Sequence, residues 1–264
     1  MVTWLDARLA AIGQPVLAAL EFLGEVMILL WDAARRLVAP PFEFREAIGQ
    51  MSFVGVSSVP IVALTTFSSG AVISLYSADI LVRYGAESLA GAAVGMAVVR
   101  EIAPVLAGIM VAARCGSAMA AQIGTMAVTE QIDALRSLNV SPIKYLVVPR
   151  IWAAVTMLPV LGLIGMFTGV IGGYLVATQA AGVPDAVFLD SVKQFMTRDD
   201  VVKGLVKTMA FGLIVVLVAC QQGMRTRDGA VGVGQATTRT VVITMVLIYI
   251  TNYFLSAALY KIGE

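Results

Sequence analysis

The sequence lacks histidine altogether, contains only two cysteines, and is poor in charged residues. Without an imidazole no Ser/His or Cys/His dyad can form, and Cys115 and Cys220 alone make neither a disulfide framework nor a His/Cys metal site. Charged residues form 13% of the chain, compared with about 25% in soluble domains. The net charge of +1 offers no basic surface for nucleic acid. We therefore expect no catalytic site, metal, cofactor or nucleic-acid partner for this chain.

A nucleotide-binding loop is also missing, because the sequence contains no Walker A motif. The segment GAVGVGQ at 229–235 is rich in glycine, but it lacks a GK[ST] ending and a preceding strand, so we do not expect it to bind phosphate. Asp199 and Asp200 indicate a solvated helix start rather than a carboxylate dyad. No pattern of a cleaved signal peptide is present at the N-terminus. If ATP drives this protein, another polypeptide must hydrolyse it.

In place of charge, the chain has long uncharged apolar runs. Hydrophobic residues form 59% of the sequence, and the runs are long enough for helices that cross a bilayer core of roughly 30 Å. We predict an all-α polytopic membrane protein with residues 1–264 in a single transmembrane domain. Its expected elements are an N-terminal helix over 1–40 and membrane helices over 47–78, 88–116, 151–178, 201–223 and 239–262.

The N-terminal helix differs from the others, because its apolar stretch is too short to span a bilayer. Glu21, Glu25, Asp32 and Arg36 share one face at helical spacing, leucines fill the rest, and two prolines at 40–41 end the helix. This pattern favours a helix that lies in the headgroup layer. The alternative is a helix that packs against a partner within the protein.

The second span carries ionisable residues at its centre. Its uncharged run is interrupted only by Arg100 and Glu101, and each charge costs at least about 2.5 kcal/mol at mid-bilayer unless it is paired or hydrated. We predict that these two residues form a buried pair, and that Pro104, one turn later, bends the helix. The first span contains Gly55 and Pro60, so it is expected to be bent or partly re-entrant.

Five spans place the two termini on opposite sides of the membrane. More basic residues fall in segments on the N-terminal side than on the other side, which favours a cytoplasmic N-terminus. The basic residues of the cytoplasmic segments are Arg8, Arg35, Arg36, Arg45, Arg136, Lys144, Arg150, Arg225, Arg227 and Arg239. Those of the external segments and span ends are Arg83, Lys193, Arg198, Lys203, Lys207 and Lys261.

A short amphipathic segment follows the second span. Val128, Ile132 and Leu135 have the spacing of one helix face, Thr129 is placed to cap the start, and Asn139 stops the helix. We predict a cytoplasmic helix over about 129–138 that either is a plain loop helix or couples the membrane domain to a soluble partner. The candidate coupling residues are Glu130, Gln131, Ile132, Asp133, Ala134 and Leu135.

One stretch of the sequence resembles a known family. VVREIAPVLAGIMVAARCGSAMAAQIGTMAVTEQIDALRSLNVSPIKYLVVPRIWA is similar to the signature region of MlaE/YrbE permeases, the membrane subunits of ABC lipid transporters that work with MCE-domain proteins. FVGVSSVPIV at 53–62 and DGAVGVGQATTRTVV at 228–242 agree with it, so the resemblance covers roughly 40–262. Many relatives have an acidic residue where this chain has Gln122.

The resemblance implies a homodimer with an interfacial N-terminal helix and five membrane helices. It also implies an ATPase subunit, with its ATP and Mg²⁺, docked on the helix after the second span, and an MCE-domain protein that exchanges phospholipid or a related lipid. A charged pair and a lysine near the lipid pathway would correspond to Arg100, Glu101 and Lys207. The location implied is the bacterial inner membrane, or the chloroplast inner envelope.

Two other functions remain open from the residues alone. The chain could be a secondary transporter or channel in which Arg100 and Glu101 line an ion path, or a membrane scaffold. The coupling-type helix and the absence of inverted repeats favour the ABC permease. Arg100, Glu101 and Lys207 are expected to face a water-accessible cavity at a dimer axis, where the cations meet a lipid phosphate. The alternative is an interhelical ion cluster that only fixes packing.

Overall fold

The computed structural model describes residues 2–36 and 44–260, with side chains from Gly13 onward except at positions 15, 16 and 44. Nearly all of these residues are helical, and none forms a strand, which confirms the all-α prediction. The elements in chain order are α1 (Val2–Arg36), α2 (Phe44–Val54), η1 (Val56–Ser58), α3 (Val59–Arg83), η2 (Glu87–Leu89), α4 (Ala90–Ala97), η3 (Val98–Ile102), α5 (Ala103–Val111), η4 (Ala112–Gly116), α6 (Ser117–Val128), α7 (Gln131–Ser137), η5 (Ile143–Val147), α8 (Val148–Gln179), α9 (Asp185–Phe195), α10 (Arg198–Met224) and α11 (Gly229–Leu259).

Within the described ranges, five helical stretches are long and apolar enough to cross a membrane. They cover Arg45–Arg83, Glu87–Val128, Ile143–Gln179, Arg198–Met224 and Gly229–Leu259. The expected spans fall within them, except that the fifth helix ends at Leu259 and leaves out residue 260. Residues 261–262 of that expected span and the two prolines at 40–41 lie outside the described residues.

Two of these helices extend well past the expected limits. The second span continues through α6 to Val128, and the fifth begins at Gly229 rather than near 239. The glycine-rich segment at 229–235 is therefore the first part of α11, and not a loop.

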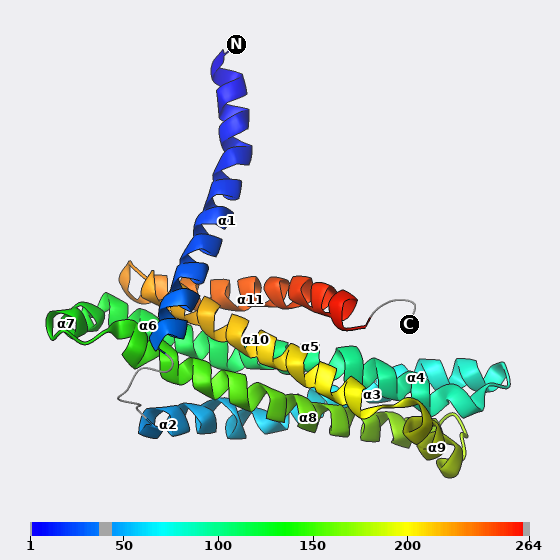
Figure 1. The fold of residues 1–264 in the computed structure, drawn as a ribbon. Coiled ribbons are helices and arrows are strands. Elements are labelled where there is room, and N and C mark those ends of the chain that lie inside the picture. The colour runs from blue at the N-terminus through cyan, green and yellow to red at the C-terminus, as the bar shows by residue number, and fades with distance from the viewer. Residues whose placement is uncertain (1, 37–43, 261–264) are drawn as a thin grey trace.

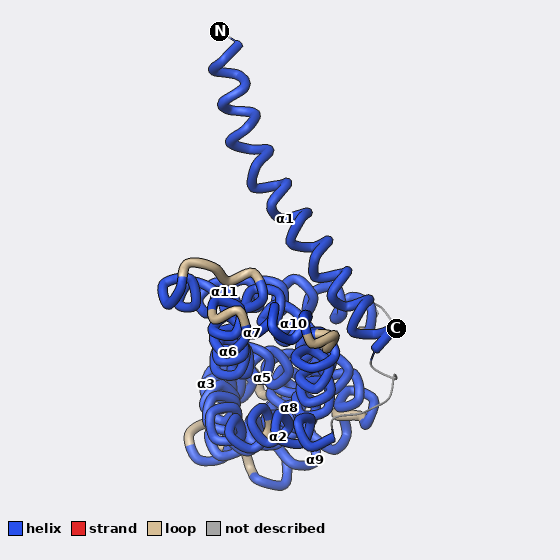
Figure 2. The backbone as a smooth tube through the Cα atoms, turned by 90° about the vertical axis from the view of Figure 1, so that its left-hand side faces the viewer, coloured by secondary structure: helices blue, strands red, loops and turns tan. Residues whose placement is uncertain are grey.

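The five long stretches run alongside one another to form an elongated bundle (Figure 1). Helix α7 and the turn between α10 and α11 lie at one end, and α9 lies at the other (Figure 1). Helix α1 projects across the long axis of the bundle at the α7 end, and most of its length stands clear of the other helices (Figures 1 and 2).

The first span is interrupted as expected. A 3₁₀ turn, η1, separates α2 from α3, and Pro60 lies in the first turn of α3, where its missing N–H costs nothing. A Cβ at Gly55, just before the turn, would lie 2.7 Å from Sδ of Met157, so glycine permits the close contact with α8. The interruption leaves the carbonyl of Phe53 free to accept a hydrogen bond from another helix.

The contact between α3 and α8 is close enough to require glycine. A Cβ at Gly70 would collide with the carbonyl of Gly169, and one at Gly172 would collide with the carbonyl of Phe67. Small residues allow helix backbones to approach in lipid, where dispersion contacts replace the hydrophobic effect as the cause of association. These contacts fix the position of α3 beside the central second span.

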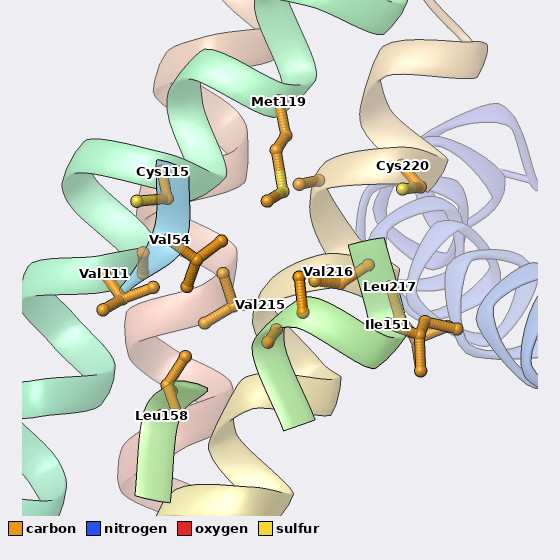
Figure 3. Close-up of a cluster of buried hydrophobic side chains, with 14 of the residues drawn as sticks. Val54, Val111, Cys115, Met119, Ile151, Leu158, Val215, Val216, Leu217 and Cys220 are labelled. Carbon is orange, nitrogen blue, oxygen red and sulfur yellow. The ribbon is translucent and has the colours of Figure 1, made fainter. Parts of the chain in front are cut away.

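The core is built where α2, the second span, α8 and α10 meet. Val54, Val111, Met119 and Val215 point toward one another from four different elements (Figure 3). Cys115 and Cys220 belong to the same buried cluster and are both free thiols, in agreement with the expectation that they form no disulfide. The core therefore holds the α7 half of the second span rigidly.

Helix α1 turns acidic side chains toward the bundle. Arg225, at the end of α10, lies 3.2 Å from Glu21 Oε1 and 3.4 Å from Glu25 Oε2, and Gln221 Nε2 donates to Glu25 at 2.7 Å. Large apolar side chains of α1 remain exposed, and they are Leu17, Leu20, Leu23, Met27, Ile28 and Trp31. Helix α1 thus contacts α10 through its acidic side chains and leaves its large apolar side chains exposed.

Candidate functional site

A local defect in the second span exposes a backbone acceptor next to its charged residues. Proline at 104 has no N–H, so the carbonyl of Arg100, four residues earlier, loses its helical partner. The chain forms a π-helical turn, η3, at this point. Lys207 Nζ of α10 donates to the freed carbonyl of Arg100 at 2.8 Å. Pro104 therefore creates the acceptor that ties the second span to the fourth.

Lys207 is the centre of a saturated hydrogen-bond cluster. Its ammonium group also donates to Glu101 Oε1 at 2.8 Å and to Ser256 Oγ at 2.7 Å, so all three N–H groups have partners. Glu101 accepts two more bonds, from Ser256 Oγ at 2.9 Å and from Asn252 Nδ2 at 2.8 Å. The Lys207 side chain is 0% exposed, whereas that of Glu101 is 43% exposed. Lys207 thus connects the second, fourth and fifth spans inside the protein, whereas the carboxylate of Glu101 faces the surface.

Arg100 and Glu101 do not pair with each other, so that prediction is wrong. Consecutive helix residues point about 100° apart, and Arg100 turns to the opposite side, where its Nε donates to Asp200 Oδ1 at 2.8 Å. Asp200 is 4% exposed and also closes a capping box with Thr197 at the start of α10. The solvated role expected for Asp200 is therefore also wrong.

The ring of Tyr260 lies among three cations beside this cluster, near the start of α10. The Arg100 guanidinium carbon is 5.0 Å from the ring centroid, and the Nζ atoms of Lys203 and Lys207 are 5.3 and 5.1 Å from it. Burial, followed by the charge of Asp200, raises the pKa of Tyr260 to about 12. The hydroxyl stays protonated at neutral pH, and the neutral ring stabilises the neighbouring cations through its negative face.

A cleft of about 550 Å³ opens on the exposed side of Glu101. Its walls come from α3, from the second span and from α11. The lining residues are Ser68, Ser69, Val72, Ile73, Glu101, Ile102, Val105, Leu106, Tyr249 and Asn252. The polar residues of the lining are Glu101, Asn252, Ser68 and Ser69, and the rest of the wall is largely apolar. The Oδ1 atom of Asn252 is itself buried and has no hydrogen-bond partner among the described residues.

The segment predicted to be helical over about 129–138 contains α7, which starts later than expected. Thr129 does not cap it, because its hydroxyl donates to the carbonyl of Thr125 instead, and Glu130 with a left-handed φ of 60° starts the helix. Ile132 is buried in the core, whereas Asp133 is exposed and pairs with Arg136 at 2.9 Å. The other candidate residues, Gln131, Ala134 and Leu135, lie on exposed or half-exposed positions of the same helix.

Two further arginines within the long helical stretches, Arg114 and Arg150, have interhelical partners that sequence reasoning missed. Arg114 Nη1 donates to the free carbonyl of Phe53 at 3.1 Å and to Ser58 Oγ at 3.0 Å, which joins the second span to the break in the first. Arg150, 3% exposed, donates to Gln122 Oε1 at 2.7 Å. Their position in apolar runs was the available signal. Their acceptors could not be found from charge patterns, because Arg114 bonds to a backbone carbonyl and Arg150 to a neutral amide.

Comparison with known proteins agrees with this architecture. The family model described as Permease MlaE matches residues 47–258. The chain belongs to the MlaE permease family. Within it, a probable ABC transporter permease protein of Rickettsia bellii is 42% identical over 252 residues, which is 96% of this chain and 97% of the relative. A probable ABC transporter permease protein of Synechocystis is 40% identical over 82% of each chain.

A more distant MlaE-family relative is a plastid protein of a plant. The protein TRIGALACTOSYLDIACYLGLYCEROL 1, chloroplastic, of Arabidopsis thaliana is 32% identical over 89% of this chain and 67% of the relative. The five apolar helices and the family membership together identify this MlaE-family protein as a multi-pass membrane permease subunit.

Proposed function

We propose that this permease is the membrane subunit of an ABC transporter that moves phospholipid or a related lipid between the inner membrane and an MCE-domain partner. A homodimer would form the membrane unit, and a separate subunit would bind ATP and Mg²⁺. Membership of the MlaE family supports the permease role, and the names of the relatives support the ABC assignment. The name of the Arabidopsis relative refers to a glycerolipid, which supports a lipid as the cargo.

The observation that carries the lipid proposal is the cleft beside Glu101. An apolar groove with a few polar groups at its base suits a molecule that has acyl chains and a small polar head. The walls of α3 and α11 are exposed along their apolar sides, as at Val72, Val246 and Tyr253, so a second copy of the chain facing this side would enclose the cleft. In that arrangement Glu101 and Asn252 would contact the polar part of the lipid.

The roles of the three charged residues then differ from one another. Lys207 holds Glu101 in place and does not itself touch the lipid in this conformation, because its donors are used and its side chain is buried. Arg100 is 35% exposed and lines a separate cavity of about 430 Å³ near the outer end. It is the cation that can meet a phosphate group as the lipid passes toward an external partner.

A bulky side chain in the cleft tests the lipid proposal. Ser68 is exposed on α3 and lines the cleft, so Ser68→Trp should fill it without disturbing the core. We expect lipid recovered with the purified complex to fall about fivefold or more and ATP-dependent lipid transport to be lost. Mass spectrometry and transport into acceptor vesicles measure these two effects.

The matched control is Leu64→Trp, one turn earlier on α3, at a side chain that is 67% exposed and outside the cleft. It should retain lipid and transport. Equal behaviour of the two variants would reject the cleft as the lipid site. Transport by the unsubstituted complex that follows an ion gradient and ignores ATP would instead favour a secondary transporter.

We further propose that α7 docks the ATPase on the cytoplasmic side, with the N-terminus and α1 on that side as well. Buried Ile132 anchors the helix, exposed Asp133 supplies a polar contact, and Leu138, 73% exposed, continues the surface with an apolar contact. The basic residues of the predicted cytoplasmic segments support this orientation.

Charge reversal at Asp133 tests the docking proposal. Asp133→Arg removes the bond to Arg136 and places two cations at the surface, so copurification of the ATPase should fall about tenfold. Asp79→Arg is a matched control, because Asp79 forms a similar exposed pair with Arg83 near the other end of the bundle. Unchanged ATPase binding and transport in Asp133→Arg would contradict the coupling role.

A further inference from the structure

A third cavity, far from the Glu101 cleft and from the cavity beside Arg100, lies at the α7 end of the bundle. It has a volume of about 900 Å³, and its lining comes from α1, from the end of α10, from the turn between α10 and α11, and from the first part of α11. Figure 1 shows that these elements meet at the α7 end of the bundle. One face of α11 looks into it, because Gly232, Gln235, Ala236 and Arg239 recur at helical spacing. The glycine-rich segment that carried part of the family resemblance therefore lines a cavity.

The cavity contains more positive than negative groups. Arg225, Arg227 and Arg239 line it, and Asp228 is the single acidic residue in its lining. Arg225 is neutralised from the side of α1 by Glu21 and Glu25. Arg227 and Arg239 are exposed, and the side chain of neither forms a hydrogen bond or ion pair with another described residue. Two guanidinium groups are thus available to an anion.

The position of the cavity along the helices indicates which kind of anion it would bind. It lies where α10 ends at Met224 and α11 begins at Gly229, which is the level of the headgroups for helices of these lengths. The wall formed by α1 contributes Ala18, Ala19 and Phe22. Beyond that wall, α1 exposes a row of large apolar side chains that suits the boundary between headgroups and acyl chains.

We propose that this cavity holds the phosphate-bearing headgroup of an anionic phospholipid from the leaflet on the α7 side. Arg227 and Arg239 bind the phosphate, and the acyl chains follow the apolar face of α1. Basic pockets of this kind between membrane helices recognise anionic lipids. The bound lipid fixes α1 against the bundle, because its headgroup contacts both the α1 wall and α11. This role is independent of the cargo that passes the Glu101 cleft.

The test compares lipid binding to the purified permease in neutral detergent. Native mass spectrometry with phosphatidylglycerol, phosphatidylcholine and inorganic phosphate measures occupancy for the unsubstituted chain and for the Arg227→Gln/Arg239→Gln double variant. We expect the unsubstituted chain to prefer phosphatidylglycerol over phosphatidylcholine about tenfold, and the double variant to lose that preference. Inorganic phosphate should not compete, because it lacks the chains that α1 contacts.

Two controls keep the result specific. Arg83→Gln/Arg198→Gln removes two exposed arginines near the other end and should leave the preference intact. Gln235→Glu introduces a carboxylate into the cavity while both arginines remain, and it should weaken phosphatidylglycerol binding even if the double variant folds poorly. A preference that survives both cavity variants overturns the proposal, and full competition by inorganic phosphate assigns the site to a free anion instead.

Discussion

Positively charged side chains differ between the centre of the bundle, where Lys207 is fully hydrogen-bonded, and its α7 end, where two of them have no partner among the described residues. At the centre, Lys207 is fully buried and each of its donors has a partner within the protein. At the α7 end, Arg227 and Arg239 line a cavity that leaves their donors free. A buried charge must be satisfied internally, since it costs several kcal/mol otherwise, whereas an exposed cation at a cavity is available to a ligand. A buried cation such as Lys207 therefore stabilises the protein, whereas exposed cations such as Arg227 and Arg239 can bind a ligand.

The largest effect is expected from removing the central brace. Lys207→Met leaves the buried carbonyl of Arg100 without a partner and the partly exposed Glu101 without its cation, so the free energy of unfolding should fall by about 3 kcal/mol. Thermal unfolding of the purified protein in detergent measures the loss. The Lys207→Met/Glu101→Gln double variant should recover part of it, because the uncompensated carboxylate is then gone. If the free energy of unfolding of Lys207→Met fell only slightly, water would be hydrating the groups that Lys207 now contacts.

A smaller effect is expected at the neighbouring pair. Asp200→Ala removes both the bridge to Arg100 and the capping box of α10, each of which contributes about 1 kcal/mol. Arg100 is partly exposed and can be hydrated, so the total loss should be about 2 kcal/mol. Asp199→Ala is the control, because Asp199 is exposed and its bridge to Lys203 is of the surface kind. Equal losses in the two variants would contradict the bracing role of Asp200.

The smallest effect is an expected increase in thermal stability. Gln122→Glu places a carboxylate against Arg150 in the position where the amide oxygen now accepts its hydrogen bond. Hydrogen bonds between charged groups are stronger than those of a neutral acceptor by about 1 kcal/mol. The melting temperature should rise by about 2–4 °C, as measured by the same unfolding assay. A fall would show that the desolvation of the new carboxylate exceeds its attraction to Arg150.

The sequence was sufficient to predict the number of spans and the interruption of the first, because uncharged runs and the positions of Gly55 and Pro60 are local properties. The long extension of α11 back to Gly229 was missed, since isolated glycines weaken a helix but do not prevent one that packs on its neighbours. Thr129 was misassigned as a cap because its hydroxyl has a competing acceptor one turn earlier.

The charged partners were harder to predict. Arg100 and Glu101 are adjacent in the chain, yet their directions on the helix send one to Asp200 and the other to Lys207. The choice depends on how α10 and α11 are rotated around the second span, which is a tertiary property. Pro104 offered a usable signal, because proline leaves the carbonyl of Arg100 without its helical partner, but it was used only to predict a bend.

The cluster around Lys207 also has a consequence for biogenesis. Glu101 is synthesised long before Lys207, and Ser256 and Asn252 emerge last. During synthesis the second span must therefore enter the bilayer with Glu101 unpaired, at a cost of about 2.5–3.5 kcal/mol that the surrounding apolar residues must offset. We expect this span to remain next to the insertion machinery, or to water, until the fourth and fifth spans arrive. Membrane insertion and tertiary assembly are thus coupled in time, because the fifth span completes the cluster that the second span began.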